Sequence, residues 1–210
     1  MASEIISTAR DTSPKPEYLA LMAKRRKALQ DELAAIMPRN AKFVWEIGSG
    51  HGHFLTAYAE AHKDQLCVGV DIIIERVRRG DKKRDRAELK NLHFVRAEAR
   101  LFLDVLPDDA RFASIYVLFP DPWPKKRHHK NRIMQADFLH RVAMRAEIGA
   151  PLYFRTDYAP YFSEVEEMLR NHPDWQLRKD NTLPFELATV FQIKAPSYQS
   201  LVAVRRQVAR

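Results

Sequence analysis

Short apolar segments alternate along most of this chain with segments whose apolar residues recur at helical spacing. The apolar segments predict buried strands at residues 43–47, 66–70, 92–95, 112–119 and 151–155. Helical patterns occupy residues 17–37, 53–62, 72–90, 100–105, 134–147 and 159–170. This alternation predicts a doubly wound α/β fold, with a mostly parallel sheet covered on both faces. The last strand candidates, 175–178 and 197–205, have no clear helix between them, which predicts an antiparallel strand near the C-terminus.

Length and composition are those of one globular domain. The chain has 210 residues, 46% hydrophobic and 30% charged, and no apolar run long enough to span a membrane. We expect a mobile arm over residues 1–16, without the pattern of a signal peptide, and a single domain over residues 17–210. The single Cys67 cannot form an internal disulfide, which fits a cytoplasmic location. No obligate protein partner is evident, and we expect a monomer or a homodimer.

The chain is basic, and its positive charge is concentrated in three clusters. Lysine and arginine outnumber aspartate and glutamate by 35 to 27, which gives a net charge of +8. Two clusters, at residues 24–27 and 76–86, fall in helical patterns, where long basic side chains often form only a solvated face. The third, at residues 125–132, follows a proline-rich loop and can hardly be helical throughout. This distribution favours a polyanionic partner such as RNA.

A glycine-rich loop follows the first predicted strand. Its glycines permit backbone angles that side chains forbid and let a ligand approach the backbone closely; they are Gly48, Gly50 and Gly52. The fingerprint of dinucleotide-binding folds needs a glycine where this chain has His53, so an NAD-dependent dehydrogenase is not indicated. Glu46 stands two residues before the loop, where its charge would repel a pyrophosphate but not the cationic S-adenosylmethionine. The loop therefore favours S-adenosylmethionine as the cofactor.

Two further acids follow the next predicted strands. Asp71 ends the second strand, where acids of nucleotide-binding folds accept hydrogen bonds from ribose hydroxyls. Glu98 follows the third strand, on the edge expected to hold the adenine, and could bind its exocyclic amine, although a surface glutamate is the commoner explanation. Both acids are candidate cofactor-binding residues.

The fourth predicted strand leads into the sequence FPDPWPKKRHHKNR at residues 119–132. Its prolines stiffen the loop and hold Asp121 beside Trp123, at the edge where open α/β sheets bind ligands. Of the bases, guanine alone offers the paired N1–H and N2–H donors that a carboxylate accepts, and the aromatic rings of the loop can stack on a base. Basic side chains suited to RNA phosphates follow at Lys125, Lys126, Arg127, Lys130 and Arg132. The loop predicts a site for guanine within RNA.

Residues 46–52, Asp71, the loop at 119–132 and residues 156–158 together resemble the bacterial tRNA (guanine-N7-)-methyltransferase family. The resemblance implies a class I methyltransferase fold and methylation of N7 of a guanine in the variable loop of tRNA. Carried over by position, it implies cofactor contacts by Glu46, Asp71, Glu98 and Asp121, with Asp121 also as the catalytic residue. It further implies substrate contacts by Lys125 and Asp157, and RNA contacts across residues 126–132.

One departure from the family lies near the C-terminus. The family usually carries a Thr-x-x-Glu motif on a loop beside the target base. This chain keeps Glu186 but has Leu183 where the threonine should stand, and Thr182 lies one residue early. Glu186 is therefore expected to contact the substrate, with Thr182 as the candidate substitute for the missing threonine.

Methylation at N7 needs no general base, because this nitrogen carries a lone pair and no proton. Two other functions remain compatible with the same residues. One is methylation of another acceptor atom, such as an exocyclic amine, and the other is RNA binding without catalysis on the same fold. The histidines at 51, 53, 128 and 129 lack the spacing of zinc ligands, so no metal is expected.

Overall fold

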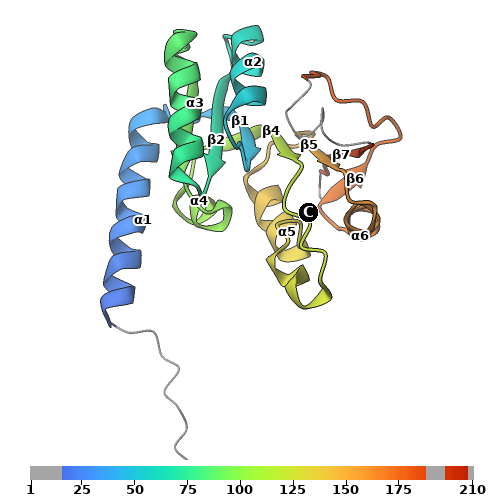
Figure 1. Ribbon diagram of the computed structural model, residues 1–210. Helices are drawn as coiled ribbons and strands as arrows, with labels where there is room; N and C mark the ends of the chain where they lie inside the picture. Colours follow the sequence, from blue (N-terminus) through green and yellow to red (C-terminus); the bar gives the residue numbers. More distant parts are fainter. Residues whose placement is uncertain (1–15, 188–196, 208–210) are drawn as a thin grey trace, which may run out of the picture.

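The computed structural model describes residues 16–187 and 197–207, so nearly all of the expected N-terminal arm lies outside the described residues. The helices are α1 (Pro16–Ile36), α2 (His53–Ala61), α3 (Ile74–Arg86), α4 (Ala99–Val105), α5 (Ala136–Arg145) and α6 (Ala159–Asn171). The strands are β1 (Lys42–Ile47), β2 (Leu66–Asp71), β3 (Leu92–Arg96), β4 (Arg111–Leu118), β5 (Pro151–Thr156), β6 (Trp175–Leu177) and β7 (Gln199–Arg205). Every predicted helix and strand is present, with modest shifts of their ends (Figure 1).

The described strands form one seven-stranded sheet in the order β3-β2-β1-β4-β5-β7-β6. Strands β1 to β5 run parallel, whereas β7 pairs antiparallel with both β5 and β6. The predicted doubly wound α/β fold with an antiparallel strand near the C-terminus is therefore confirmed. The chain leaves β1 toward β2 and β3, then returns to β4 on the other side of β1. Open α/β sheets bind ligands where the strand order reverses in this way, at the carboxyl ends of β1 and β4.

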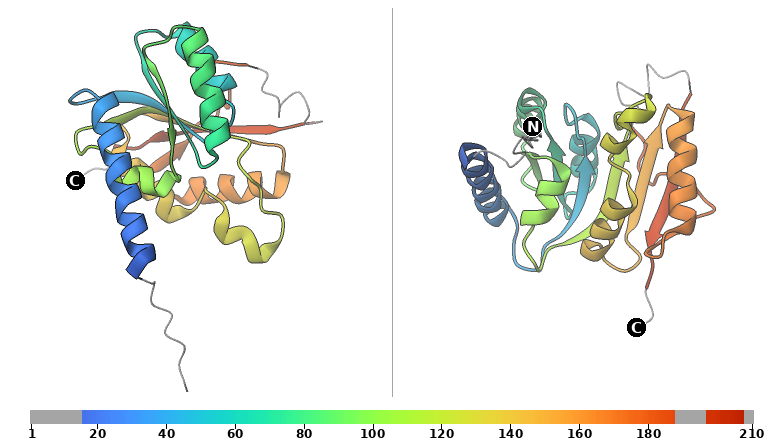
Figure 2. Two further views of the ribbon diagram at one scale, coloured as in Figure 1. Left: turned by 60° about the vertical axis from the view of Figure 1, so that its left-hand side comes forward. Right: turned by 90° about the horizontal axis from the view of Figure 1, so that it is seen from below.

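Side chains of each strand alternate between two hydrophobic cores, one on each face of the sheet. In β1, Phe43 and Trp45 lie in the larger core and Val44 in the smaller one. Figures 1 and 2 show α4, α5 and α6 along the face of the larger core, which α1 also joins, with α2 and α3 on the opposite face. Residues 183–187 complete the smaller core. No helix in the described ranges combines the length and the apolar character needed to cross a membrane.

The main departure from the expected layout follows the proline-rich loop. Where the sequence predicts an irregular segment, the structure has a short 3-10 helix, η1 (Lys126–Asn131). Its first turn closes through a hydrogen bond from the His128 N–H to the Lys125 carbonyl, at 2.8 Å. The last proline, Pro124, lies before this turn, so every residue of η1 keeps its backbone donor. The prolines therefore stiffen only the first half of the segment, and the basic residues share one compact turn.

Candidate active site

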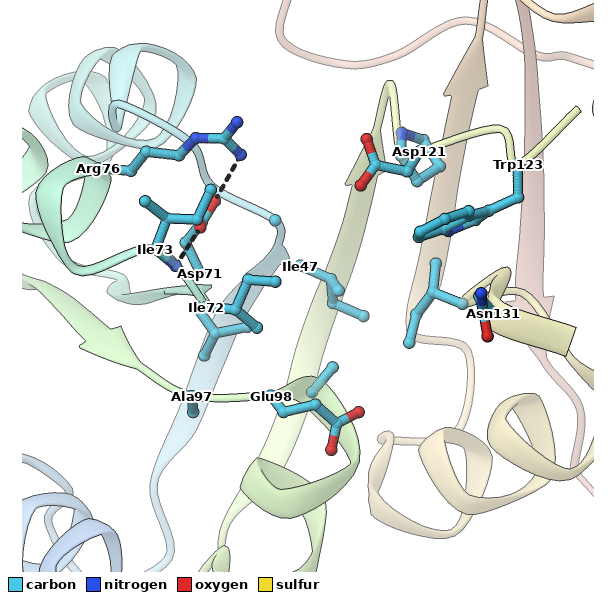
Figure 3. A pocket seen from close by; sticks show the side chains of 15 residues that line it. Ile47, Asp71, Ile72, Ile73, Arg76, Ala97, Glu98, Asp121, Trp123 and Asn131 are labelled. Atoms are coloured by element: carbon cyan, nitrogen blue, oxygen red, sulfur yellow. Dashed lines mark hydrogen bonds and ion pairs between the residues drawn. The ribbon is translucent and has the colours of Figure 1, made fainter. Parts of the chain in front are cut away.

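Two adjoining pockets open at the carboxyl edge of the sheet, around the ends of β1, β2 and β4, and Figure 3 shows the first of them. The residues that line the first pocket include Asp71, Ile72, Ala97, Glu98 and Trp123. The residues that line the second include Glu46, Ser49, His51, His53 and Phe54. Both pockets share Gly48, Arg76, Pro120 and Asp121. The two pockets therefore form one continuous site, which we call the cleft.

The glycine-rich loop has the backbone geometry that its sequence predicts. Gly48, Gly50 and Gly52 have φ angles of 73°, 54° and 71°, in the left-handed region that favours glycine. A Cβ atom at Gly52 would lie 2.5 Å from the ring of Phe94, so a side chain there would also clash. A Cβ atom at Gly48 would meet nothing within 4 Å, which leaves open space beside the backbone of the cleft. A ligand can therefore approach the backbone at Gly48.

Asp71 ties the glycine-rich loop to the start of α3. Its Oδ2 accepts a hydrogen bond from the Gly50 N–H at 3.0 Å, and its Oδ1 accepts one from the Ile73 N–H at 2.8 Å. The Arg76 Nη1 lies 3.5 Å from Oδ2, and Figure 3 shows this cation over the carboxylate. Each carboxylate oxygen has more than one acceptor site, so Asp71 can still bind a hydroxyl. The expected ribose contact remains a prediction.

Glu46 is a buried acid whose Oε2 has no hydrogen-bond partner within the described part of the chain. Only 4% of the residue is exposed. Burial, with a smaller contribution from the negative charge of Asp71, raises the pKa of Glu46 from 4.5 to about 8. An unpaired buried carboxyl beside a pocket is costly unless a cation or donor joins it. The residues of the cleft therefore fit S-adenosylmethionine, which carries an amino group and a positively charged sulfur.

Glu98 has a structural role that its sequence context did not reveal. It is the N-cap residue of α4, and its carboxylate accepts hydrogen bonds from the N–H groups of Arg100 and Leu101 at 3.1 and 3.0 Å. This capping holds the carboxylate at the edge of the first pocket, as Figure 3 shows. The expected contact with the adenine amine stays a prediction. The capping hydrogen bonds fix the orientation of the carboxylate that would make it.

The proline-rich loop carries Asp121 to the place where the two pockets meet. The flanking Phe119 and Trp123 have positive φ angles of 51° and 43°. Such angles are rare for bulky residues and cost roughly 1–3 kcal/mol each, so the surrounding structure must hold them. At one end the Phe119 N–H donates to the Arg155 carbonyl of β5 at 2.8 Å. Backbone strain held in this way is common at functional sites. The contacts that anchor the loop place Asp121 in the cleft.

Arg132 holds the other end of the loop, and its burial argues against the expected contact with RNA. The side chain is only 1% exposed. Its Nε donates to the Pro122 carbonyl at 2.9 Å, and its guanidinium pairs with Glu164 and lies 4.7 Å from the ring centroid of Tyr161. Both of these latter partners come from α6, which packs against the loop and excludes solvent. Arg132 therefore braces the loop from inside.

The other basic residues of this segment are exposed, as expected for phosphate binding. Lys125 precedes η1, and the helix itself carries Lys126, Arg127 and Lys130. The Arg127 Nε donates a hydrogen bond to the His128 Nε2 at 3.2 Å, and this contact helps to orient the Arg127 side chain. Contact of these residues with RNA remains a prediction.

The remaining expected substrate-binding residues are Asp157, Thr182 and Glu186. Asp157 is exposed directly after β5, and Thr182 is exposed with its N–H bonded to Asp180 at 2.9 Å. Glu186 forms a bidentate pair with Arg155, at 2.6 and 2.8 Å. As far as the chain is described, none of the three lines the cleft. Their contacts with substrate stay predictions.

Leu183 accounts for the departure from the Thr-x-x-Glu pattern. It is 3% exposed and lies in the smaller core with Phe54 and Tyr58. A leucine suits this environment better than a threonine, because no hydroxyl has to be satisfied there. Thr182 beside it is exposed, and its role as a substitute for the family threonine stays a prediction.

Two arginines, one in the cleft and one behind the proline-rich loop, were not singled out from the sequence. Arg76 lines both pockets, and Arg155 is buried at the end of β5, where its Nε donates to the Ser200 Oγ at 2.8 Å. A signal for Arg155 was present, since a charged residue in an otherwise apolar strand needs a partner. Arg76 was visible only as one member of a long basic run.

Comparison with known proteins identifies relatives of this chain. A family model described as "Putative methyltransferase" matches residues 40–202. A tRNA (guanine-N(7)-)-methyltransferase of Thermotoga maritima is 39% identical over 130 residues, which cover 62% of this chain and 42% of that protein. The protein of the same name from Caulobacter vibrioides is 32% identical over 159 residues, which cover 73% of this chain and 70% of that protein.

A solved methyltransferase structure from Pyrococcus furiosus matches with a TM-score of 0.58 at 12% identity, over 93% of this chain and 88% of that one. At this identity the match supports the fold alone. The chain spans about half the length of the first curated relatives it matches. Fold, cleft and sequence agree, and the chain belongs to this methyltransferase family, which it shares with bacterial tRNA (guanine-N(7)-)-methyltransferases.

Proposed function

We propose that this protein transfers a methyl group from S-adenosylmethionine to N7 of a guanine in the variable loop of tRNA. The observation that carries the proposal is the position of Asp121. This carboxylate stands where the two pockets meet, on a strained loop that leads directly into the basic turn η1. The names of the relatives support the same reaction.

In this proposal the two pockets bind different parts of the cofactor. Asp71 and Glu98 would hold the adenosine part, and the unpaired Glu46 would hold the cationic amino-acid part. When bound, S-adenosylmethionine supplies an electrophilic methyl group on a positively charged sulfur. Gly48 supports this placement. It lines both pockets and has no side chain, so the space beside its backbone is open to the cofactor.

Asp121 orients the acceptor base. Its carboxylate can accept hydrogen bonds from the N1–H and N2–H of guanine, and Trp123 offers a ring for stacking worth about 1–3 kcal/mol. Methylation gives the purine ring a positive charge, which a fixed carboxylate stabilises more strongly than it stabilises the neutral base. In this proposal Asp157 or Glu186 would complete the base contacts.

No residue of the cleft needs to remove a proton. The N7 lone pair forms the new bond to the methyl carbon, while the carbon–sulfur bond breaks and its electron pair stays on sulfur. The protein therefore contributes through position and electrostatics rather than through a general base. The lining of the cleft agrees with this. It includes several carboxylates, and among the described residues neither His51 nor His53 forms an ion pair with an acid.

The exposed cations of η1 would contact phosphates next to the target nucleotide. We place the protein in the cytoplasm with its tRNA substrate, acting as a monomer or a homodimer without an obligate protein partner. The relatives' names support the substrate class, and a basic turn beside the cleft supports an RNA partner.

Replacement of Asp121 tests the function. We expect Asp121→Asn to lower methyl transfer to tRNA by about a hundredfold or more, since it removes the oriented negative charge that stabilises the methylated base. The melting temperature should stay unchanged, because Asp121 is exposed. Transfer is measured with labelled S-adenosylmethionine and bulk tRNA, and nuclease digestion with mass spectrometry identifies the methylated nucleoside.

Each alternative has its own outcome in that experiment. A methylated nucleoside other than N7-methylguanosine would favour another acceptor atom. Tight tRNA binding by the wild-type protein without any methyl transfer would favour a non-catalytic RNA-binding protein. Near-normal turnover by Asp121→Asn would remove Asp121 from its proposed role.

A further inference from the structure

One face of α3 carries a row of cations that the proposed reaction does not use. Arg76, Arg79, Lys83 and Arg86 follow each other at intervals of three, four and three residues, so they lie along one side of the helix. We call this row the α3 stripe. On the side of α3 that faces the domain, Val77 and Gly80 are buried.

The α3 stripe faces the glycine-rich loop and the start of α2. The Arg79 Nη1 lies 3.4 Å from the His51 Nε2, and the Lys83 Nζ donates to the His51 carbonyl at 2.8 Å. Lys83 and Arg86 line a shallow groove together with His53, Thr56 and Ala57 of α2. His53 lines both this groove and the second pocket. The row of cations therefore leads from the mouth of the cleft along the groove between α2 and α3.

Most of this positive charge is not neutralised by the protein. Arg76 has Asp71 at 3.5 Å, but within residues 16–187 and 197–207 no carboxylate forms an ion pair with Arg79, Lys83 or Arg86. Arg84 on the same helix differs, because it pairs with both Asp81 and Asp85. Among the described residues, Glu60 is the one acid that lines the groove.

The cations of the stripe also act on one another. Burial and the charges of Arg79 and Arg86 lower the pKa of Lys83. Burial and the charges of Arg79, Lys83 and Arg76 lower the pKa of His51. Like charges held this close are unfavourable in the free protein, and a bound polyanion would remove that cost.

The stripe and η1 approach the cleft from opposite sides. In Figure 3, Arg76 reaches over the pocket from α3, while Asp121 and Trp123 enter from the loop that leads to η1. A guanosine seated at Asp121 therefore has basic surface on both sides. An RNA strand continues in both directions from any internal nucleotide, so one basic patch alone would leave half of its backbone without contacts.

We propose that the α3 stripe binds backbone phosphates of the RNA on the side of the target nucleotide opposite η1. The proposal rests on the proposed function, since it assumes an RNA substrate in the cleft. It assigns an RNA contact to Arg79, Lys83 and Arg86. From sequence alone, these residues could equally form a solvated helix face without a partner.

The test compares two double variants of α3 that remove the same charge. Arg79→Gln/Arg86→Gln changes the stripe, whereas Arg78→Gln/Lys82→Gln changes cations of the same helix that line neither the groove nor the cleft. For each protein, tRNA affinity is measured over a series of salt concentrations. The affinity for S-adenosylmethionine and the melting temperature are measured alongside.

We expect the stripe variant to bind tRNA several-fold more weakly. Its plot of log affinity against log salt should flatten by roughly 0.7–0.9 for each phosphate that the protein no longer neutralises. The control variant should keep nearly the wild-type slope, and both should keep the wild-type affinity for S-adenosylmethionine. Equal flattening in the two variants would show a diffuse charge effect and overturn the proposal.

Two further outcomes would also overturn it. An unchanged slope in the stripe variant would mean that these cations touch no phosphate. A fall in cofactor affinity with an unchanged slope would mean that the stripe only supports the glycine-rich loop through His51. The proposed function fails separately, since that failure would appear in the wild-type protein as an absence of methyl transfer to tRNA.

Discussion

At the scale of single residues, Glu46 links the cleft to pH. Its pKa lies near 4.5 in an unfolded chain and at about 8 in the folded protein, so folding favours its protonated form. The stability that this group contributes is therefore complete below pH 4.5 and is lost as pH rises to about 8. A permanent positive charge in the second pocket would favour the carboxylate and lower that pKa.

We predict that binding of S-adenosylmethionine releases a proton from Glu46 below pH 8. Affinity should then increase with pH in the neutral range, by at most about tenfold per unit. Glu46→Gln should bind more weakly and lose this component of the pH dependence. Isothermal titration calorimetry in buffers of different ionisation enthalpy measures both quantities. The same proton release in wild type and variant would contradict the assignment.

Leu183 is a second residue whose role depends on its surroundings. It is buried with Phe54 and Tyr58, at the position where the family usually has threonine. We predict that Leu183→Thr lowers the free energy of unfolding by about 1–3 kcal/mol, because it removes apolar contacts and buries a hydroxyl. The exposed Thr182→Ala should change it by less than about 0.5 kcal/mol. Urea denaturation measures both values, and a stable, more active Leu183→Thr protein would refute this interpretation of the loop.

At the scale of elements, the proline-rich loop works as one strained unit. Phe119 and Trp123 hold positive φ angles, and Arg132 secures the loop through the Pro122 carbonyl and through α6. The loop carries the proposed catalytic group, so relaxation of its backbone would move Asp121. A displacement of about 1 Å in such a site can lower a rate by about a hundredfold.

We predict that Arg132→Gln lowers kcat by about tenfold to a hundredfold while the salt dependence of tRNA binding stays at the wild-type slope. The exposed Lys126→Gln and Lys130→Gln should do the opposite, each flattening that slope by roughly 0.7–0.9 with a smaller effect on kcat. Steady-state kinetics and salt titrations separate the two effects. A flattened slope in Arg132→Gln would restore the RNA contact that burial argues against.

At the scale of the whole molecule, the cleft spans both sides of the reversal in strand order. Its lining comes from the ends of β1, β2 and β4, from the starts of α2, α3 and α4, and from the proline-rich loop. A ligand in the cleft therefore bridges the two halves of the sheet and favours the folded state.

We predict that S-adenosylmethionine at about a hundred times its Kd stabilises the protein by about 2.7 kcal/mol. For a domain of this size, the melting temperature should rise by roughly 5–10 °C. NAD serves as the control and should give no shift, because the glycine-rich loop has His53 where a dinucleotide site needs glycine. Thermal scanning measures both. Equal shifts with the two ligands would point to a general nucleotide site.

Much of this protein could be predicted from the sequence by itself. Alternating apolar and helical segments determined the parallel sheet, because each pattern can bury its apolar residues in only one kind of element. Parallel strands end at the same edge of a sheet, so the sequence also determined that Glu46, Asp71, Glu98 and Asp121 would gather there. The left-handed glycines followed from the same local reasoning.

Only the tertiary structure decided what individual side chains do once distant segments meet. Arg132 is buried against α6, where it pairs with Glu164, 32 residues later in the sequence. Arg155 pairs with Glu186, 31 residues later. Leu183 joins a core built by α2 and neighbouring strands, and the α3 stripe lies beside the glycine-rich loop only because the chain folds back on itself. Burial and pairing depend on contacts between segments far apart in the chain, and a local pattern of residues does not contain them.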